Sequence, residues 1–135
     1  MKFIADAMLG KLGRWLRLLG HDTKIAPEIL TDSEILELAL KENRFLLTRD
    51  KQFYQRARKL VKTHYFKTRG AKNELKELAK AIKLKIDFPK QTRCSLCNGK
   101  LKKKGEFWIC SKCSQTYWKG THWKMIEKTI RELRK

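Results

Sequence analysis

The chain has 135 residues and a net charge of +19, from 33 Lys and Arg against 14 Asp and Glu. This length suits one ordinary domain, or a smaller domain with a compact appendage. No apolar run approaches the roughly 20 residues of a membrane span, and an acid and glycines interrupt the N-terminal apolar stretch early, unlike a signal peptide; we therefore expect a soluble, cytoplasmic protein with no membrane partner.

The first half alternates segments that favour strands with segments that favour helices. Short strands are expected at residues 2–6, 23–26, 44–48 and 62–66, and helices at residues 7–20, 32–43, 51–60 and 72–84. Such alternation predicts a short parallel sheet covered by helices on both faces. Residues 1–88 are therefore expected to form a compact α/β domain.

The helix predicted at 7–20 has an apolar and a polar face. The apolar face holds Met8, Leu9, Leu12, Trp15, Leu16 and Leu19, and the opposite face holds Gly10, Lys11, Gly13, Arg14 and Arg17. A glycine inside a helix costs roughly 1 kcal/mol relative to alanine, so these glycines indicate a close approach by a phosphate or a neighbouring segment. Lys11 and Arg14 are candidate contacts to an RNA backbone; the alternative is a solvated basic face.

Acidic residues follow the predicted strands. Asp6 ends the first strand, Asp50 comes just after the third, and Asp32 and Glu34 begin the second helix. Ligands of open α/β sheets bind at the carboxyl ends of the strands, and converging carboxylates suit Mg²⁺ or Mn²⁺. Structural roles compete with this interpretation, since Thr31 and Glu34 fit a capping box, Asp32 suits the helix dipole and Asp50 can cap the next helix. Asp6 is the hardest to explain without a partner.

The four cysteines predict a second unit over residues 89–120. Cys94, Cys97, Cys110 and Cys113 form two CxxC pairs separated by twelve residues, which is typical of a four-thiolate zinc ribbon. A hairpin is expected to turn near Gly105, with a third strand at 115–120. Sulfur fills all four positions, so the zinc is expected to be structural. His122 is either a further candidate ligand or a surface or capping residue, and residues 121–135 are expected to form a closing helix.

Basic residues are concentrated after residue 50. Residues 1–50 are balanced in charge, whereas residues 51–90 carry +10 and residues 91–135 carry +9. A protein with a pI above roughly 9 is typically a nucleic-acid binder, although lysines also solubilise proteins, above all at high temperature. Lys102, Lys103 and Lys104 form a candidate phosphate-binding edge, which could equally protect the ribbon from edge-to-edge aggregation. The ribbon aromatics Phe107, Trp108, Tyr117 and Trp118 are candidates for its core or for stacking on bases.

Several motifs together resemble the Mut-seven C-terminal RNase family, part of the wider PIN-like nuclease group. They are DAMLGKLGRWLRLLGHD, TDSEILELAL, RFLLTRD, and CSLC and CSKC with YWKGTHW. The resemblance covers nearly the whole chain. It implies a three-layer PIN-like fold followed by a zinc ribbon, and metal-dependent RNA cleavage that leaves 5′-phosphate and 3′-hydroxyl ends. It also implies that Asp6, Asp32 and Asp50, with Glu34 a further candidate, form the acidic site.

One departure from the family pattern affects the function. Many PIN nucleases have a further acid after the fourth strand, where this chain has YFKTRG. Lys67 and Arg69 are candidates to hold phosphate there. The main expectation is a Mg²⁺- or Mn²⁺-dependent ribonuclease. One alternative is a non-catalytic RNA-binding zinc-ribbon protein involved in RNA maturation or the ribosome. Another is a toxin of a toxin–antitoxin pair, although an added zinc ribbon is unusual for a small toxin.

Overall fold

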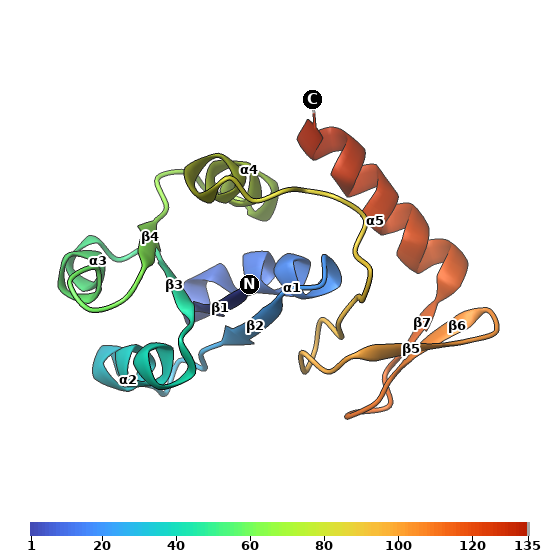
Figure 1. Ribbon diagram of the computed structural model, residues 1–135, viewed down its shortest axis with the longest axis horizontal. Helices are drawn as coiled ribbons and strands as arrows, with labels where there is room; N and C mark the ends of the chain where they lie inside the picture. The colour runs from blue at the N-terminus through green and yellow to red at the C-terminus, as the bar shows by residue number, and fades with distance from the viewer. Residues whose placement is uncertain (135) are drawn as a thin grey trace.

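A computed structural model of the chain describes residues 1–134 (Figure 1). Its first sheet has four parallel strands in the order β2-β1-β3-β4. The strands are β1 (Lys2–Ala5), β2 (Asp22–Ile25), β3 (Phe45–Thr48) and β4 (Thr63–Tyr65). The four strands predicted from the alternating pattern are thus confirmed, each within a few residues of its expected bounds.

Helices cover both faces of this sheet. They are η1 (Ala7–Leu9), α1 (Gly10–Leu18), α2 (Asp32–Glu42), α3 (Lys51–Ala57), α4 (Ala71–Ile82) and α5 (Lys119–Arg134). On one face, α2 and α3 pack on Ile4 and Leu46. On the other face, α1, α4 and α5 pack on Phe3, Ala5 and Leu47. Successive strand residues point to opposite faces, so the central strands β1 and β3 are buried on both sides.

Helix α1 departs from the predicted pattern at three positions. Met8 is 72% exposed rather than part of the apolar face, because it lies in the short η1 turn, where the side chain of Asp6 caps the backbone. Arg17 is only 7% exposed, so the solvated basic face is wrong for this residue. Gly13 is also buried: a Cβ there would lie 2.6 Å from Cγ1 of Ile25. The close approach expected at Gly13 is therefore made by β2.

Gly20 follows the C-terminal cap of α1, Leu19. Its φ is +95°, a region that favours glycine, and its amide donates to the carbonyl of Arg17. The next amide, that of His21, donates to the carbonyl of Leu16. The chain then turns directly into β2.

The second unit is a three-stranded antiparallel sheet in the order β5-β6-β7. Its strands are β5 (Leu101–Lys104), β6 (Phe107–Cys110) and β7 (Thr116–Trp118), and Gly105 forms the hairpin turn with a φ of +58°. Figure 1 shows α5 leaving this sheet and running toward α4. Ile126 and Ile130 of α5 share a core cluster with Phe3, so the last helix packs into the α/β body. None of the helices within residues 1–134 has the length and apolar content that crossing a membrane requires.

Candidate functional site

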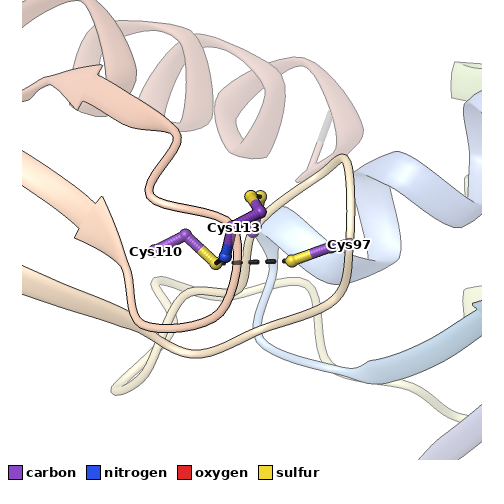
Figure 2. Close-up of side chains that lie close together, drawn as sticks. Cys97, Cys110 and Cys113 are labelled. Carbon is purple, nitrogen blue, oxygen red and sulfur yellow. Dashed lines mark hydrogen bonds between the residues drawn. The ribbon is translucent and has the colours of Figure 1, made fainter.

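The four cysteines come together between the ribbon and the α/β body. Within residues 1–134, their sulfurs are the one group of three or more Cys, His, Asp or Glu ligand atoms that gather closely, all within 4.8 Å of one another. Sγ of Cys97 lies 3.3 Å from Sγ of Cys110 (Figure 2). Sγ of Cys94 lies 3.7 Å from Sγ of Cys113. The cluster is a possible metal site consistent with structural zinc, as the CxxC spacing predicts.

Backbone amides favour the thiolate form of Cys110. Burial of the Cys110 thiol opposes ionisation, but the amides of Cys113 and Lys112 donate to its sulfur and lower its pKa to about 6. Gly99 makes room for the sulfurs, since a Cβ there would lie 2.8 Å from Sγ of Cys110. The thiolate is the metal-binding form of cysteine, so this backbone arrangement suits a metal.

Tyr117 and Arg17 form a second layer around the sulfurs. The Tyr117 hydroxyl lies 3.3 Å from Sγ of Cys94 and accepts a hydrogen bond from the amide of Ser95. Burial lowers the pKa of Arg17, while the nearby thiolates of Cys94 and Cys97 raise it. Groups that contact the ligands in this way orient them and tune their basicity.

His122 lies outside this cluster. It is 3% exposed, so the expectation of a surface histidine is wrong. Its Nε2 lies 3.4 Å from the Thr92 hydroxyl, which itself donates to the carbonyl of Leu18. The hydroxyl proton is thus already used, and Nε2 must be the donor to Thr92. Burial lowers the pKa of His122, in keeping with this neutral form.

Asp6 lies at the carboxyl end of β1, as predicted, and has several partners. Oδ1 accepts from the amide of Met8 at 3.0 Å. Oδ2 accepts from the Thr48 hydroxyl at 2.8 Å and from the amide of Arg49 at 3.4 Å. Asp6 is half-buried; these bonds offset the cost of partly desolvating its charge and fix the carboxylate between the ends of β1 and β3.

The other predicted acids all lie at helix N-termini. Asp50 caps α3 by accepting from the amide of Phe53 at 3.1 Å, and Thr48 joins it to Asp6, because the amide of Asp50 donates to the Thr48 hydroxyl. Thr31 and Glu34 form the predicted capping box of α2, in which Thr31 lowers the pKa of Glu34 through its amide and then its hydroxyl. Asp32 is the first residue of α2. The structure thus links Asp6 with Asp50, but within residues 1–134 it does not gather Asp6, Asp32 and Asp50 into one ligand cluster.

A hollow of about 370 Å³ lies next to Asp6 through Met8 and Arg49, whose amides donate to its carboxylate; Asp6 itself is not one of the lining residues. The hollow is lined by Ala7, Met8, Gly10, Lys11, Arg14, Arg49, Gly70, Ala71 and Glu74. Lys11 and Arg14, both predicted as RNA contacts, therefore lie on the same hollow. With Arg49 they give it three positive charges against one carboxylate, which suits an anion.

Sequence reasoning missed Arg49 and Glu74. They form an ion pair, and Glu74 is 3% exposed although it is charged. The region after the fourth strand was expected to offer no carboxylate. Glu74 lies on α4 just beyond the motif YFKTRG, in a first helical turn where an acid is ordinarily explained by the dipole. No sequence signal reveals that Glu74 is buried. The nearest signal is its position one turn after Gly70, the N-cap of α4.

The remaining predicted RNA contacts are spread over two exposed segments. Lys67 and Arg69 lie in the loop after β4, which Glu77 holds by accepting from the amides of Lys67 and Thr68. Lys102, Lys103 and Lys104 are exposed on the edge strand β5. Nothing in the described contacts joins either group to Asp6.

Comparison with known proteins gives one family. The model of the Mut7-C RNAse domain matches residues 1–105 and again residues 101–130. No curated protein and no solved structure matches the chain significantly.

Proposed function

The chain belongs to the Mut7-C RNAse domain family, and we propose that it is a metal-dependent ribonuclease that hydrolyses RNA phosphodiester bonds. In this proposal the α/β body is a PIN-like nuclease domain and the ribbon is a zinc-stabilised RNA-binding unit. The observation that carries the proposal is the position of Asp6. Its carboxylate is fixed at the carboxyl end of a central strand, beside a hollow lined by Lys11, Arg14 and Arg49.

The acidic edge fits a divalent cation that keeps part of its water shell. Mg²⁺ is usually held by one or two carboxylates together with waters and substrate phosphates, rather than by a closed protein cage. Asp6 and Asp50 supply two carboxylates joined through Thr48. In the described part of the chain, Oδ2 of Asp50 makes no hydrogen bond, and its cap uses Oδ1 alone. We propose that Asp6 and Asp50 hold Mg²⁺ or Mn²⁺, with Asp32 and Glu34 as further acids at the start of α2.

Each side chain then has a defined part in hydrolysis. Lys11, Arg14 and Arg49 bind the phosphate and neutralise its charge. Asp6 and Asp50 fix the position at which water attacks phosphorus. A new water-oxygen–phosphorus bond forms while the phosphorus–O3′ bond breaks, which leaves the 5′-phosphate and 3′-hydroxyl ends that the family resemblance implies. A bound divalent ion supplies an activated water and stabilises the charge on the phosphate.

The zinc ribbon supplies binding rather than chemistry in this proposal. Cys94, Cys97, Cys110 and Cys113 hold one Zn²⁺ and leave no open coordination position. Lys102, Lys103 and Lys104, with Lys67 and Arg69, add positive charge along the path of the RNA. Binding of single-stranded RNA is then expected to weaken steeply with salt, with a slope of roughly −0.7 per phosphate neutralised.

The test is Mn²⁺-dependent shortening of a labelled single-stranded RNA by the parent protein and by Asp6→Asn. Asparagine keeps one oxygen, which can accept from the amide of Met8, and its NH2 group can donate to the Thr48 hydroxyl. It lacks the negative charge, so the fold is expected to persist while cleavage is lost. The matched control is Asp87→Asn, the same change at an exposed acid in the segment before the ribbon. Cleavage by Asp6→Asn at the parent rate would refute the nuclease proposal.

A second candidate function is RNA binding without cleavage, as in RNA maturation or on the ribosome. Two observations favour it: the net charge of +19, and the lack of a three-acid ligand cluster within residues 1–134. It predicts salt-dependent RNA binding by the parent protein with no Mn²⁺-dependent shortening. The same assay therefore separates the two functions.

A further inference from the structure

One face of the ribbon sheet is exposed and carries aromatic rings beside lysines. The register pairs Phe107 with Trp118 across β6 and β7, and Lys104 with Phe107 across β5 and β6. The side chains two residues along each strand point the same way. We call this surface the ribbon face; it consists of Lys102, Lys104, Phe107, Ile109, Thr116 and Trp118.

The alternation of side chains along β6 and β7 places the four ribbon aromatic residues on opposite faces of the sheet, two on each face. Trp108 and Tyr117 point to the other side, where they pack on the cluster of Cys94, Leu101 and Cys110. Phe107 and Trp118 instead remain 46% and 47% exposed. The ribbon core thus explains Trp108 and Tyr117, but it does not explain why two large rings lie open to solvent side by side.

Contacts at their edges hold the two exposed rings in place. The rings of Phe107 and Trp118 meet edge to face, with centroids 5.1 Å apart. A Cβ at Gly120 would lie 2.8 Å from Nε1 of Trp118, so this glycine lets the indole lie against the first turn of α5. An aromatic side chain ordered before binding loses little conformational freedom when a ligand stacks on it.

Positive charge surrounds the rings. Lys102 and Lys104 are exposed on the ribbon face itself. The surface therefore complements a polyanion that also offers flat apolar groups.

We propose that the ribbon face binds single-stranded RNA, with unpaired bases stacked on Phe107 and Trp118 and phosphates bound by Lys102 and Lys104. Bases of a single strand offer a π-face to any aromatic ring, so such binding tolerates many sequences. Duplex RNA keeps its bases stacked inside the helix and cannot use the rings. The proposal rests on the proposed function only in taking RNA as the substrate, because none of the contacts described within residues 1–134 joins the ribbon face to Asp6 or Asp50.

The experiment measures the affinity of zinc-loaded protein for a labelled single-stranded RNA and for the same strand with abasic nucleotides, without Mg²⁺, Mn²⁺ or chelator. Removing both rings in Phe107→Ala/Trp118→Ala is expected to weaken binding of the base-containing strand by at least about thirtyfold, because each stacked base contributes about 1–3 kcal/mol. Binding of the abasic strand is expected to change by less than about twofold, and the salt dependence is expected to stay that of the parent. Trp118→Phe keeps a ring and is expected to retain most of the affinity.

The matched control is Phe88→Ala, which removes a ring that is 45% exposed but lies outside the ribbon sheet. Zinc content and circular dichroism establish that each variant is folded. Equal RNA affinity of the double variant, Phe88→Ala and the parent would overturn the proposal. Equal affinity of the parent for the base-containing and abasic strands would also overturn it, and would favour a protein partner for this face. Failure of the nuclease proposal gives a different result: no Mn²⁺-dependent cleavage, with base-dependent binding intact.

Discussion

Replacing Arg17 with methionine is expected to loosen the ribbon from the α/β body. The guanidinium lies at their junction, where Nε donates to the carbonyl of Thr23 on β2 and Nη1 donates to the carbonyl of Ser95 in the first cysteine knuckle, both at 2.8 Å. The residue is 7% exposed. Methionine keeps most of the apolar stem but removes both donors, so Arg17→Met tests these two bonds with little change in packing volume.

The size of the effect follows from these contacts. Hydrogen bonds to charged groups contribute about 1.5–3 kcal/mol each. The variant no longer has to bury a cation, and this saved desolvation energy offsets part of the loss of the two bonds. We expect a net loss of about 3 kcal/mol, which corresponds to a fall in Tm of roughly 10 °C for a chain of this size. The Cys94 and Cys97 thiolates also interact favourably with Arg17, so zinc should leave the variant faster.

Two measurements test this expectation. Thermal unfolding of zinc-loaded protein gives the stability change, and transfer of zinc to a chromogenic chelator gives the release rate. Arg14→Met is the control, because it makes the same change on the same helix at an exposed position. If Arg17→Met unfolds within about 2 °C of the parent and releases zinc at the parent rate, the junction is not held by this guanidinium.

Three further predictions follow from individual contacts. Tyr117→Phe should weaken zinc binding about tenfold in a chelator competition, because it removes the hydroxyl beside Sγ of Cys94; unchanged affinity would contradict this second-layer role. Burial, and then the N-terminal amino group, hold the pKa of His21 at about 4, so the unfolded chain binds more protons below pH 6.5 and stability should fall between about pH 6.5 and 4. His21→Phe should flatten this part of a pH series of denaturant unfolding curves, and an unaltered slope would exclude His21 as its cause. Gly13→Ala should lower Tm despite the higher helix propensity of alanine, because its Cβ would lie 2.6 Å from Cγ1 of Ile25, and a raised Tm would show that Ile25 yields easily.

The elements of the fold were predictable because their signals are local. Alternation of short apolar segments with helical periodicity predicts strands and helices wherever both are buried, and Gly20 and the Thr31–Glu34 capping box mark helix ends directly. The cysteine spacing predicts the ribbon in the same way. Each of these features depends on residues close together in the sequence.

The errors arose where contacts are distant in sequence. Arg17 is buried because its partners include Ser95, 78 residues away, and no periodicity within the helix encodes that contact. Met8 is exposed because the Asp6 cap begins a short η1 turn ahead of α1, which changes the helical phase. Glu74 is a buried acid because Arg49 lies beside it. The sequence predicts the exposure of a residue from its position on its own helix, whereas contacts with residues distant in sequence determine its actual environment.

At the proposed acidic site, a structural role of a carboxylate does not exclude a functional one. The sequence offered helix capping and metal binding as alternatives for Asp50 but no cap for Asp6, and the structure has capping bonds at both. A carboxylate has about four lone-pair sites, and Asp50 uses Oδ1 alone for its cap. Capping amides fix a carboxylate without using up its capacity to accept. Asp6→Asn therefore separates the two roles, which the hydrogen bonds alone do not, since asparagine can cap a helix but carries no charge to hold a cation.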